Sequence, residues 1–267
     1  MYSSLKKTAG RVKMTAVGLG HARFWASLGG ELEYINSAHS EQSGKKIGIF
    51  CVHGTADRAY GLGPIARRLI EKGLPKTVSK IHLVSFEGRG AGHGIEFFAA
   101  QLIQQIKDAG YTEVYLLGHS RGGLVCSYAA EYLAQEHNIR VHAIFNLASP
   151  YGGSDLAFEF LAWFSTSVEQ MQPGSEFLCE LTKKVLVSSV KYYFFEAGED
   201  GIVRKGLAYI AEYVKHNPDS LIKLEKHTHL SIVSSHDLVT IICSMVDGSY
   251  KRPVEQTPQP IFALNLF

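Results

Sequence analysis

The sequence predicts an α/β fold with a mostly parallel central sheet flanked by helices. Continuous apolar runs of strand length occur at residues 47–52, 80–86, 113–117 and 141–147, as expected for strands that are covered on both faces. Amphipathic segments of helical length lie between these runs, and strands that alternate with such helices pair in parallel through right-handed crossovers. With 267 residues, 46% of them hydrophobic, the chain is long enough for one such domain with a modest insertion.

The N-terminal segment, residues 1–44, has no clean period of either kind, and it predicts a short leading hairpin or a loosely attached arm. Its basic residues are not followed by a continuous apolar stretch, and no run in the chain is long enough to span a bilayer. We therefore expect no cleavable secretion signal, no transmembrane segment and a cytoplasmic protein.

Two amphipathic helices are predicted in the first half of the sheet domain. The first keeps its apolar side chains on one face from Ile95 to Ile106 and ends at Gly110. The second has the same spacing from Leu124 to Leu133.

The alternation stops after Pro150. Residues 151–190 have helical spacing, are rich in Phe, Leu and Trp, and contain no obvious strand. They predict a helix-rich insertion over one edge of the sheet. We therefore expect the whole chain, residues 1–267, to form one domain with its core at about residues 45–250.

The alternation then resumes. A strand is predicted at residues 191–195, a helix near 207–214, a strand at 221–225 and a last amphipathic helix through 238–245. Residues 251–267 contain three prolines and predict an irregular tail.

The net charge and the cysteine spacing bear on possible nucleic-acid binding and on disulfide bonds. The net charge is +2 and the basic residues are scattered, so no nucleic-acid partner is expected. The four cysteines lie far apart without a C-x-x-C spacing, and two of them fall in apolar segments. Buried free thiols are the simpler interpretation, and a disulfide stays open.

The segment Gly118-His-Ser-Arg-Gly122 has the spacing G-x-S-x-G. It follows one predicted strand and opens the next predicted helix, with Gly123 allowing close packing. A turn of this kind holds the serine backbone in a strained conformation and exposes the hydroxyl at the carboxyl end of the sheet. Ser120 is therefore the predicted nucleophile, the alternative being a serine that only caps the helix.

A nucleophilic serine needs a base, and the base needs an orienting acid. On such a turn both follow the serine in the chain, on loops after later strands. Asp200 follows the predicted strand 191–195 and precedes Gly201, which favours it as the acid. Glu196 and Glu199 are the alternatives.

Three histidines follow the next predicted strand: His227, His229 and His236. His229 lies midway between that strand and the last helix, so its side chain can reach over the sheet edge, whereas His236 falls in the first turn of the helix. We expect one His229 ring nitrogen to reach Ser120 Oγ and the other to face Asp200.

An oxyanion hole needs two backbone donors. The N–H of Arg121, at the start of the helix after the serine, is one candidate. The N–H of Thr55, in the His-Gly-Thr loop after the first predicted strand, is the other, with His53 expected only to pack in that loop.

From about residue 47 to 245 the chain resembles the lipase and lipase-like esterase branch of the α/β-hydrolases. The likeness extends to triacylglycerol lipases and GPI inositol-deacylase-like hydrolases. It is carried by several segments in the expected order, at residues 53–55, 118–125, 148–157, 171–178, 198–203 and 229–235. The resemblance implies an α/β-hydrolase fold with a cap.

One position departs from the pattern of these lipases, which commonly read Pro-His-x-Gly-Ser. Tyr151 stands in the place of that histidine, so substrate contacts are not carried over in detail. In the cap implied by the resemblance, an aromatic and aliphatic cluster either lines an acyl site or seats the cap on the core: Phe158, Phe160, Leu161, Trp163 and Phe164. No cofactor is implied, and no acidic cluster is assigned to a metal.

These residues together predict a serine hydrolase of carboxylic esters that works through an acyl-enzyme. The expected substrate is a lipid or lipid-like ester with an apolar acyl group, met through transient contact with a lipid surface. An acyltransferase or thioesterase would use the same residues, and a catalytically silent binding protein of the same fold is the alternative from another class.

Overall fold

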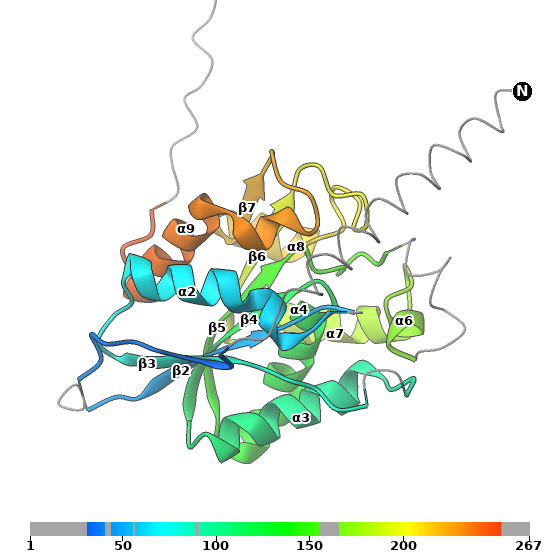
Figure 1. The fold of residues 1–267 in the computed structure, drawn as a ribbon. Coiled ribbons are helices and arrows are strands. Elements are labelled where there is room, and N and C mark those ends of the chain that lie inside the picture. The colour runs from blue at the N-terminus through cyan, green and yellow to red at the C-terminus, as the bar shows by residue number, and fades with distance from the viewer. Residues whose placement is uncertain (1–30, 41–43, 56, 89–90, 155–165, 252–267) are drawn as a thin grey trace, which may run out of the picture.

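The computed structural model describes residues 31–40, 44–55, 57–88, 91–154 and 166–251. These residues form a seven-stranded sheet of order β1-β3-β2-β4-β5-β6-β7, with helices on both faces (Figure 1). The strands are β1 (Glu33–Ile35), β2 (Ile47–Val52), β3 (Val78–Leu83), β4 (Glu113–His119), β5 (Arg140–Leu147), β6 (Lys191–Ala197) and β7 (Leu221–Leu224). β1 pairs antiparallel with β3, and all other neighbours pair in parallel. The predicted α/β architecture is confirmed.

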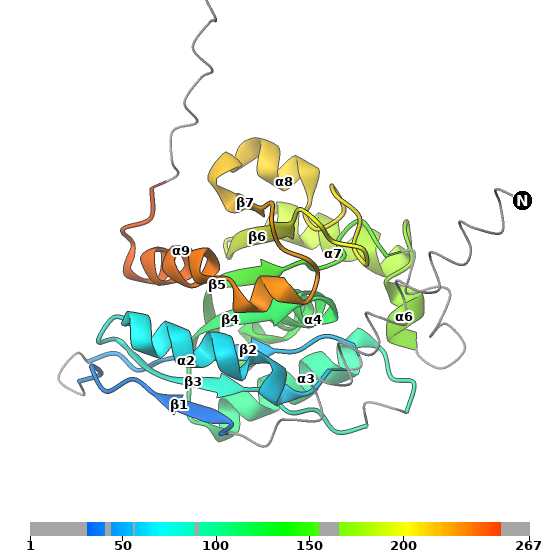
Figure 2. The same cartoon turned by 45° about the horizontal axis from the view of Figure 1, so that its top comes forward.

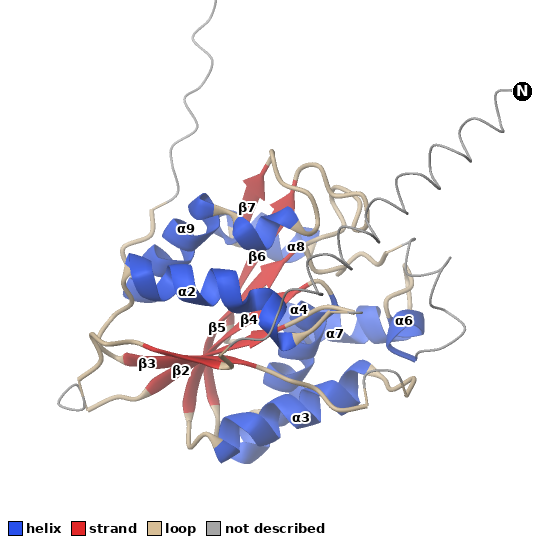
Figure 3. Cartoon of the chain, in the orientation of Figure 1, coloured by secondary structure: helices blue, strands red, loops and turns tan. Residues whose placement is uncertain are grey.

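Helices connect the strands and cover the sheet (Figure 3). The α-helices of the described residues are α2 (Gly63–Lys72), α3 (Ile95–Asp108), α4 (Arg121–Tyr128), α6 (Thr166–Gln170), α7 (Glu176–Leu186), α8 (Ala211–His216) and α9 (His236–Asp247). A π-helical segment, Ala129–Leu133, continues α4, and short 3-10 helices occur at Ala59–Leu62, Gln135–His137, Pro218–Ser220 and Ser231–Ser234. None of the helices in this part of the chain is long and apolar enough to cross a bilayer.

The sheet separates two hydrophobic cores. α3, α4 and α7 pack on one face, and α2 and α9 pack on the other, as Figure 2 shows. Alternate side chains of a strand point to opposite faces, so Phe50 of β2 enters the first core and its neighbours Ile49 and Cys51 enter the second. All six residues of β2 are buried, which explains its continuous apolar sequence.

Two predicted boundaries were wrong. β3 begins at Val78 and ends at Leu83, whereas the apolar run predicted residues 80–86. The strand includes the polar Ser79 because its hydroxyl forms a hydrogen bond of 2.8 Å with the Tyr111 hydroxyl. α8 begins at Ala211, later than predicted, because Leu207 is held in a turn and its carbonyl accepts the Gly152 N–H at 2.9 Å.

The N-terminal segment contributes an edge strand. Residues 31–40 of the predicted hairpin or arm are described, and within them β1 pairs with β3 through Tyr34 and Ile81. Glu33 on β1 forms a salt bridge of 2.8 Å with Lys80 on β3. The described part of this segment is therefore a strand of the main sheet and not a separate hairpin.

The predicted cap is described in part. α6 and α7 fall within it, and Ser175 caps α7 by accepting the Leu178 N–H at 3.2 Å. Leu178, Leu181 and Val185 of α7 are buried in the core against α3 and α4, so this half of the insertion covers the sheet. The aromatic cluster predicted for the acyl site, Phe158 to Phe164, lies outside the described residues.

All four cysteines are free. Cys51, Cys126 and Cys243 are buried and Cys179 is exposed. Burial raises the pKa of all three buried thiols, that of Cys243 to about 11. They are packed as small apolar groups, as the sequence indicated for two of them.

Candidate active site

The predicted catalytic residues follow three strands of the sheet at their carboxyl ends. Ser120 follows β4, Asp200 lies in the loop after β6, and His229 lies in the loop after β7. The three strands are labelled in Figure 2. Because these strands are parallel, their carboxyl ends meet at one edge of the sheet.

Ser120 stands on a strained turn between β4 and α4. Its φ of 55° and ψ of −128° are a combination that residues with side chains rarely adopt. The Ser120 N–H donates to the Leu147 carbonyl at 2.8 Å, and the Ser120 carbonyl accepts the Gly123 N–H at 3.0 Å. The turn is therefore held on both sides, as an exposed nucleophile requires.

The glycines around Ser120 are required by packing. A Cβ on Gly122 would lie 2.2 Å from the Val52 carbonyl oxygen, and a Cβ on Gly118 would lie 2.4 Å from Gly123. Both distances are far shorter than real carbon contacts. The G-x-S-x-G spacing thus reflects close approach between β2, β4 and α4 at this position.

Asp200 and His229 form a buried pair. Asp200 Oδ2 lies 2.8 Å from His229 Nδ1, and the two side chains are 3% and 6% exposed. The other carboxylate oxygen, Oδ1, accepts the N–H groups of Ile202 and Val203 at 2.7 and 2.8 Å. Since an ionised carboxylate only accepts, the hydrogen is on Nδ1, and Nε2 is left with the lone pair that a general base needs.

The alternative acids have other roles in the structure. Glu196 is buried and its carboxylate accepts the Gly206 N–H, which closes the loop after β6. Glu199 is exposed, and its N–H donates to the His227 carbonyl at 2.9 Å.

The alternative bases are placed less favourably. His227 has its Nδ1 3.4 Å from Ser231 Oγ, and His236 is exposed at the first residue of α9. Among these three histidines, His229 is the one whose ring meets a candidate acid.

His229 is linked to the serine turn by His119, the residue that precedes Ser120. The described hydrogen bonds include none between Ser120 Oγ and His229, but His119 Nε2 is 2.8 Å from the His229 carbonyl oxygen. The two imidazole centroids are 4.9 Å apart. In unliganded enzymes the contact between nucleophile and base is often long and tightens when substrate binds.

The loop after β2 lies close to Ser120, the predicted nucleophile. A Cβ on Gly54 would lie 2.9 Å from Ser120 Cβ and 3.5 Å from Ser120 Oγ. Thr55, the candidate donor of the oxyanion hole, follows Gly54, and the other candidate, Arg121, is the first residue of α4. His53 packs in this loop, with its ring centroid 5.3 Å from that of Phe86.

The side chain of Arg121 was not assigned a role from the sequence. It is buried, its guanidinium lies 4.3 Å from the centroid of the Phe98 ring, and Nη1 donates to Ser167 Oγ at 3.2 Å. This residue therefore joins the serine turn to α6 of the predicted cap.

Tyr151 is buried in the core, where it contacts α4, the helix that follows Ser120. Its hydroxyl is 2.5 Å from Ser127 Oγ and donates to Asn146 Oδ1 at 3.0 Å. Its ring packs edge-on against Phe194 at 5.1 Å, and burial raises the pKa of the phenol. The residue that departs from the lipase pattern thus supports α4 and β5.

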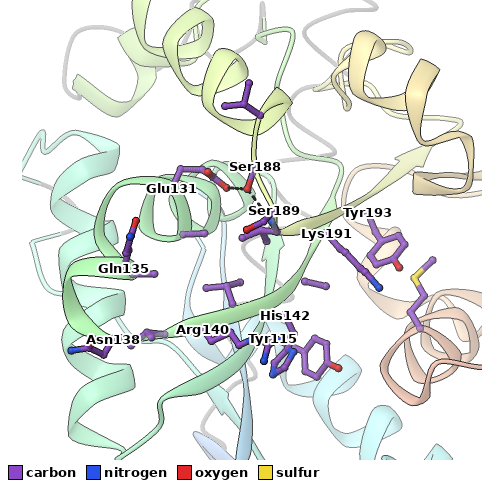
Figure 4. Close-up of a pocket in the computed structure, with 18 residues that line it drawn as sticks. Tyr115, Glu131, Gln135, Asn138, Arg140, His142, Ser188, Ser189, Lys191 and Tyr193 are labelled. Carbon is purple, nitrogen blue, oxygen red and sulfur yellow. Dashed lines mark hydrogen bonds between the residues drawn. The ribbon is translucent and has the colours of Figure 1, made fainter.

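A hollow of about 920 Å³ lies at the amino ends of β5 and β6. Figure 4 shows the side chains that line it. Arg140 and Lys191, the first residues of β5 and β6, line it together with Glu131 and Ser188. None of the predicted site residues that the structure describes lines it. In the described part of the chain, no group of three or more His, Cys, Asp and Glu side chains is placed to hold a metal ion.

Comparison with known proteins adds a family and a fold. The sequence model of the PGAP1-like alpha/beta domain matches residues 83–246. No curated protein sequence matches the chain.

Three solved structures are similar to this one. The lin2722 product of Listeria innocua is 18% identical with a TM-score of 0.55, covering 78% of this chain and 96% of its own. The mature Bacillus licheniformis lipase BlEst2 is 15% identical with a TM-score of 0.57, covering 82% and 96%. Aspergillus fumigatus lipase B is 14% identical with a TM-score of 0.56, covering 81% and 56%. At these identities the likeness establishes the fold that the chain shares with lipases and esterases.

Proposed function

This chain belongs to the family of PGAP1-like alpha/beta domains, and from that starting point we propose that it hydrolyses carboxylic esters through an acyl-enzyme on Ser120. The observation that carries the proposal is the buried hydrogen bond of 2.8 Å between Asp200 and His229, beside the strained turn that presents Ser120. A strained serine, an imidazole with one free lone pair and a carboxylate held by backbone donors are the parts of a catalytic triad.

The first half of the reaction forms the acyl-enzyme. His229 Nε2 takes the proton of Ser120 Oγ as the oxygen attacks the ester carbonyl carbon. Asp200 keeps the imidazole in the required tautomer and stabilises the imidazolium that forms. The N–H groups of Arg121 and Thr55 hold the oxyanion of the tetrahedral intermediate, and the start of α4 adds its positive dipole end.

The second half releases the acid. The His229 imidazolium gives its proton to the leaving alcohol, and the same nitrogen then takes a proton from a water molecule that attacks the acyl carbon. The tetrahedral intermediate collapses, Ser120 Oγ regains a proton, and the carboxylic acid leaves.

The proposed substrate carries an apolar acyl group. Support comes from the Phe, Leu and Trp content of the predicted cap and from the fold shared with two proteins that are described as lipases. Phe97, at the start of α3, is 38% exposed, and Phe86 and Phe98 are buried behind it. An apolar acyl chain would bury surface against such side chains.

The proposal is tested with a series of nitrophenyl esters of increasing acyl length. Wild-type protein should release the acid and bind a fluorophosphonate covalently, and Ser120→Ala should do neither. Hydrolysis that persists in Ser120→Ala would rule out the proposed nucleophile, and transfer of the acyl group to an added alcohol in place of water would identify a transferase.

A further inference from the structure

A second buried pair of an acid and an imidazole lies beside the proposed triad. Asp57, in the loop after β2, is 5% exposed, and His119, the last residue of β4, is 3% exposed. His119 Nδ1 is 4.0 Å from Asp57 Oδ2. The proposed mechanism uses neither residue.

One hydrogen bond of His119 fixes the position of its ring. Its Nε2 is 2.8 Å from the carbonyl oxygen of His229, and because a carbonyl oxygen only accepts, Nε2 carries a hydrogen. Nδ1 faces the Asp57 carboxylate from 4.0 Å, beyond hydrogen-bonding distance. The loop after β7 therefore fixes the ring through Nε2, and the Asp57 carboxylate attracts the other side of the ring when Nδ1 is also protonated.

The hydrogen bond between His119 and the His229 carbonyl joins two parts of the site that are far apart in the sequence. His119 is bonded to Ser120 in sequence and hydrogen-bonded to His229, 110 positions later. The loop after β7 is also hydrogen-bonded to the loop after β6, which carries Asp200. There the Glu199 N–H donates to the His227 carbonyl at 2.9 Å. That second bond places the base relative to Asp200, whereas the His119 bond places it relative to Ser120.

We propose that His119 is a positioning residue, which holds the backbone of His229 at the working distance from Ser120, and that Asp57 orients the His119 ring for this purpose. The inference rests on the proposed hydrolase function. It accounts for two buried polar side chains at the sheet edge, where a group without such a role would be costly to bury.

The distance between base and nucleophile is sensitive to this contact. Proton transfer requires the two heavy atoms to approach within hydrogen-bonding reach, and a displacement of about 1 Å costs on the order of 100-fold in rate. Among the described hydrogen bonds, the one from His119 is the link between the His229 backbone and the strand that leads into the serine turn. The loss should appear in kcat, since substrate contacts are unchanged.

Two amides of different reach provide the test. The side-chain nitrogen of His119→Gln lies near the position of Nε2 and can donate to the His229 carbonyl, whereas the shorter His119→Asn cannot reach it. We expect His119→Asn to lower kcat about 10- to 100-fold with KM little changed, and His119→Gln to recover most of that loss. His142→Gln, on the neighbouring strand β5 and outside the site, is the matched control and should keep wild-type kcat.

Equal kcat values for His119→Gln and His119→Asn would overturn the proposal, as would wild-type kcat in His119→Asn. Thermal unfolding of both variants checks that the amides differ in function and not in folding. Asp57→Asn should reproduce a smaller part of the loss, because the ring keeps its bond to His229.

A measurement without substrate separates this inference from the proposed function. The Nδ1 proton between His229 and Asp200 should give a low-field NMR signal, assigned by its loss in His229→Gln. We expect His119→Asn to shift or broaden this signal and His119→Gln to preserve it, whether or not the protein hydrolyses esters. A signal that is identical in all His119 variants would contradict the positioning role even if ester hydrolysis is found.

Discussion

The carboxylate of Asp200 meets His229 through one oxygen only, Oδ2, while its other oxygen accepts two backbone N–H groups of its own loop. Three hydrogen bonds thus hold the Asp200 carboxylate, two of them from the backbone of its own loop, and the carboxylate in turn fixes the orientation of the His229 ring.

Asp200→Asn should remove activity with little loss of folding stability. The amide oxygen can keep the two backbone bonds, which places the amide nitrogen toward His229 Nδ1. That nitrogen donates, so it selects the tautomer with hydrogen on Nε2, which cannot accept the serine proton. We expect kcat/KM to fall by about 10⁴-fold, the size of effect seen when a triad acid becomes an amide. Ester hydrolysis measures it.

Glu199→Gln is the matched control for this substitution, because Glu199 is exposed in the same loop. Its described hydrogen bond is made by its backbone N–H, which the substitution keeps. It should retain wild-type kcat/KM. If Glu199→Gln were the damaging change and Asp200→Asn the harmless one, the acid would be misassigned.

Ser120→Gly should be more stable than Ser120→Ala, although both are inactive. At φ 55° and ψ −128° a Cβ is strained, and glycine removes that strain. The free energy of unfolding should be higher in the glycine variant by about 1 kcal/mol. Urea unfolding of the two variants measures the difference, and an alanine variant of equal or higher stability would show that the turn is unstrained.

Gly122→Ala should destabilise the protein severely. The added Cβ would lie 2.2 Å from the Val52 carbonyl oxygen, so β2 and α4 would have to separate. We expect a loss of at least about 3 kcal/mol in the free energy of unfolding, or no soluble folded protein. Gly201→Ala is the control, because nothing lies within 4 Å of a Cβ there, and its unfolding free energy should change by less than about 0.5 kcal/mol.

Trp163→Ala tests the predicted acyl site in the cap. If this side chain contacts the acyl group, kcat/KM should fall progressively with acyl length, since each buried methylene contributes about 0.8 kcal/mol. Acetyl esters should be almost unaffected. The same fractional loss for acetyl and long-chain esters would show that Trp163 only seats the cap.

Much of the sheet could be predicted because burial on both faces leaves a clear sequence pattern. β2 and β5 were located to within one residue of their bounds for this reason. α2 was not predicted, because it opens with Gly63-Pro64, a sequence typical of turns, and has charged residues at Arg67 and Arg68. Its burial against α9 depends on a segment far along the chain.

The acid and base were proposed from loop positions, and the structure places Asp200 and His229 in contact. The direct contact expected between His229 and Ser120 Oγ is not among the described hydrogen bonds. The role of His119 has no sequence signal of its own, since it depends on a backbone carbonyl 110 positions away. Contacts with backbone atoms of distant loops leave no residue pattern to recognise.

Ser120 and His229, the proposed nucleophile and base, follow strands that are held in the sheet by different numbers of neighbours. β4 is paired on both sides, with β2 and β5, whereas β7 is a four-residue strand that, among the described strands, pairs with β6 alone and ends the sheet. Edge segments open at a lower free-energy cost than strands at the centre of a sheet. Warming would therefore withdraw the base by fraying of β7 while the serine turn remains folded. Loss of activity by such local opening should be reversible on cooling and should precede the cooperative unfolding of the domain.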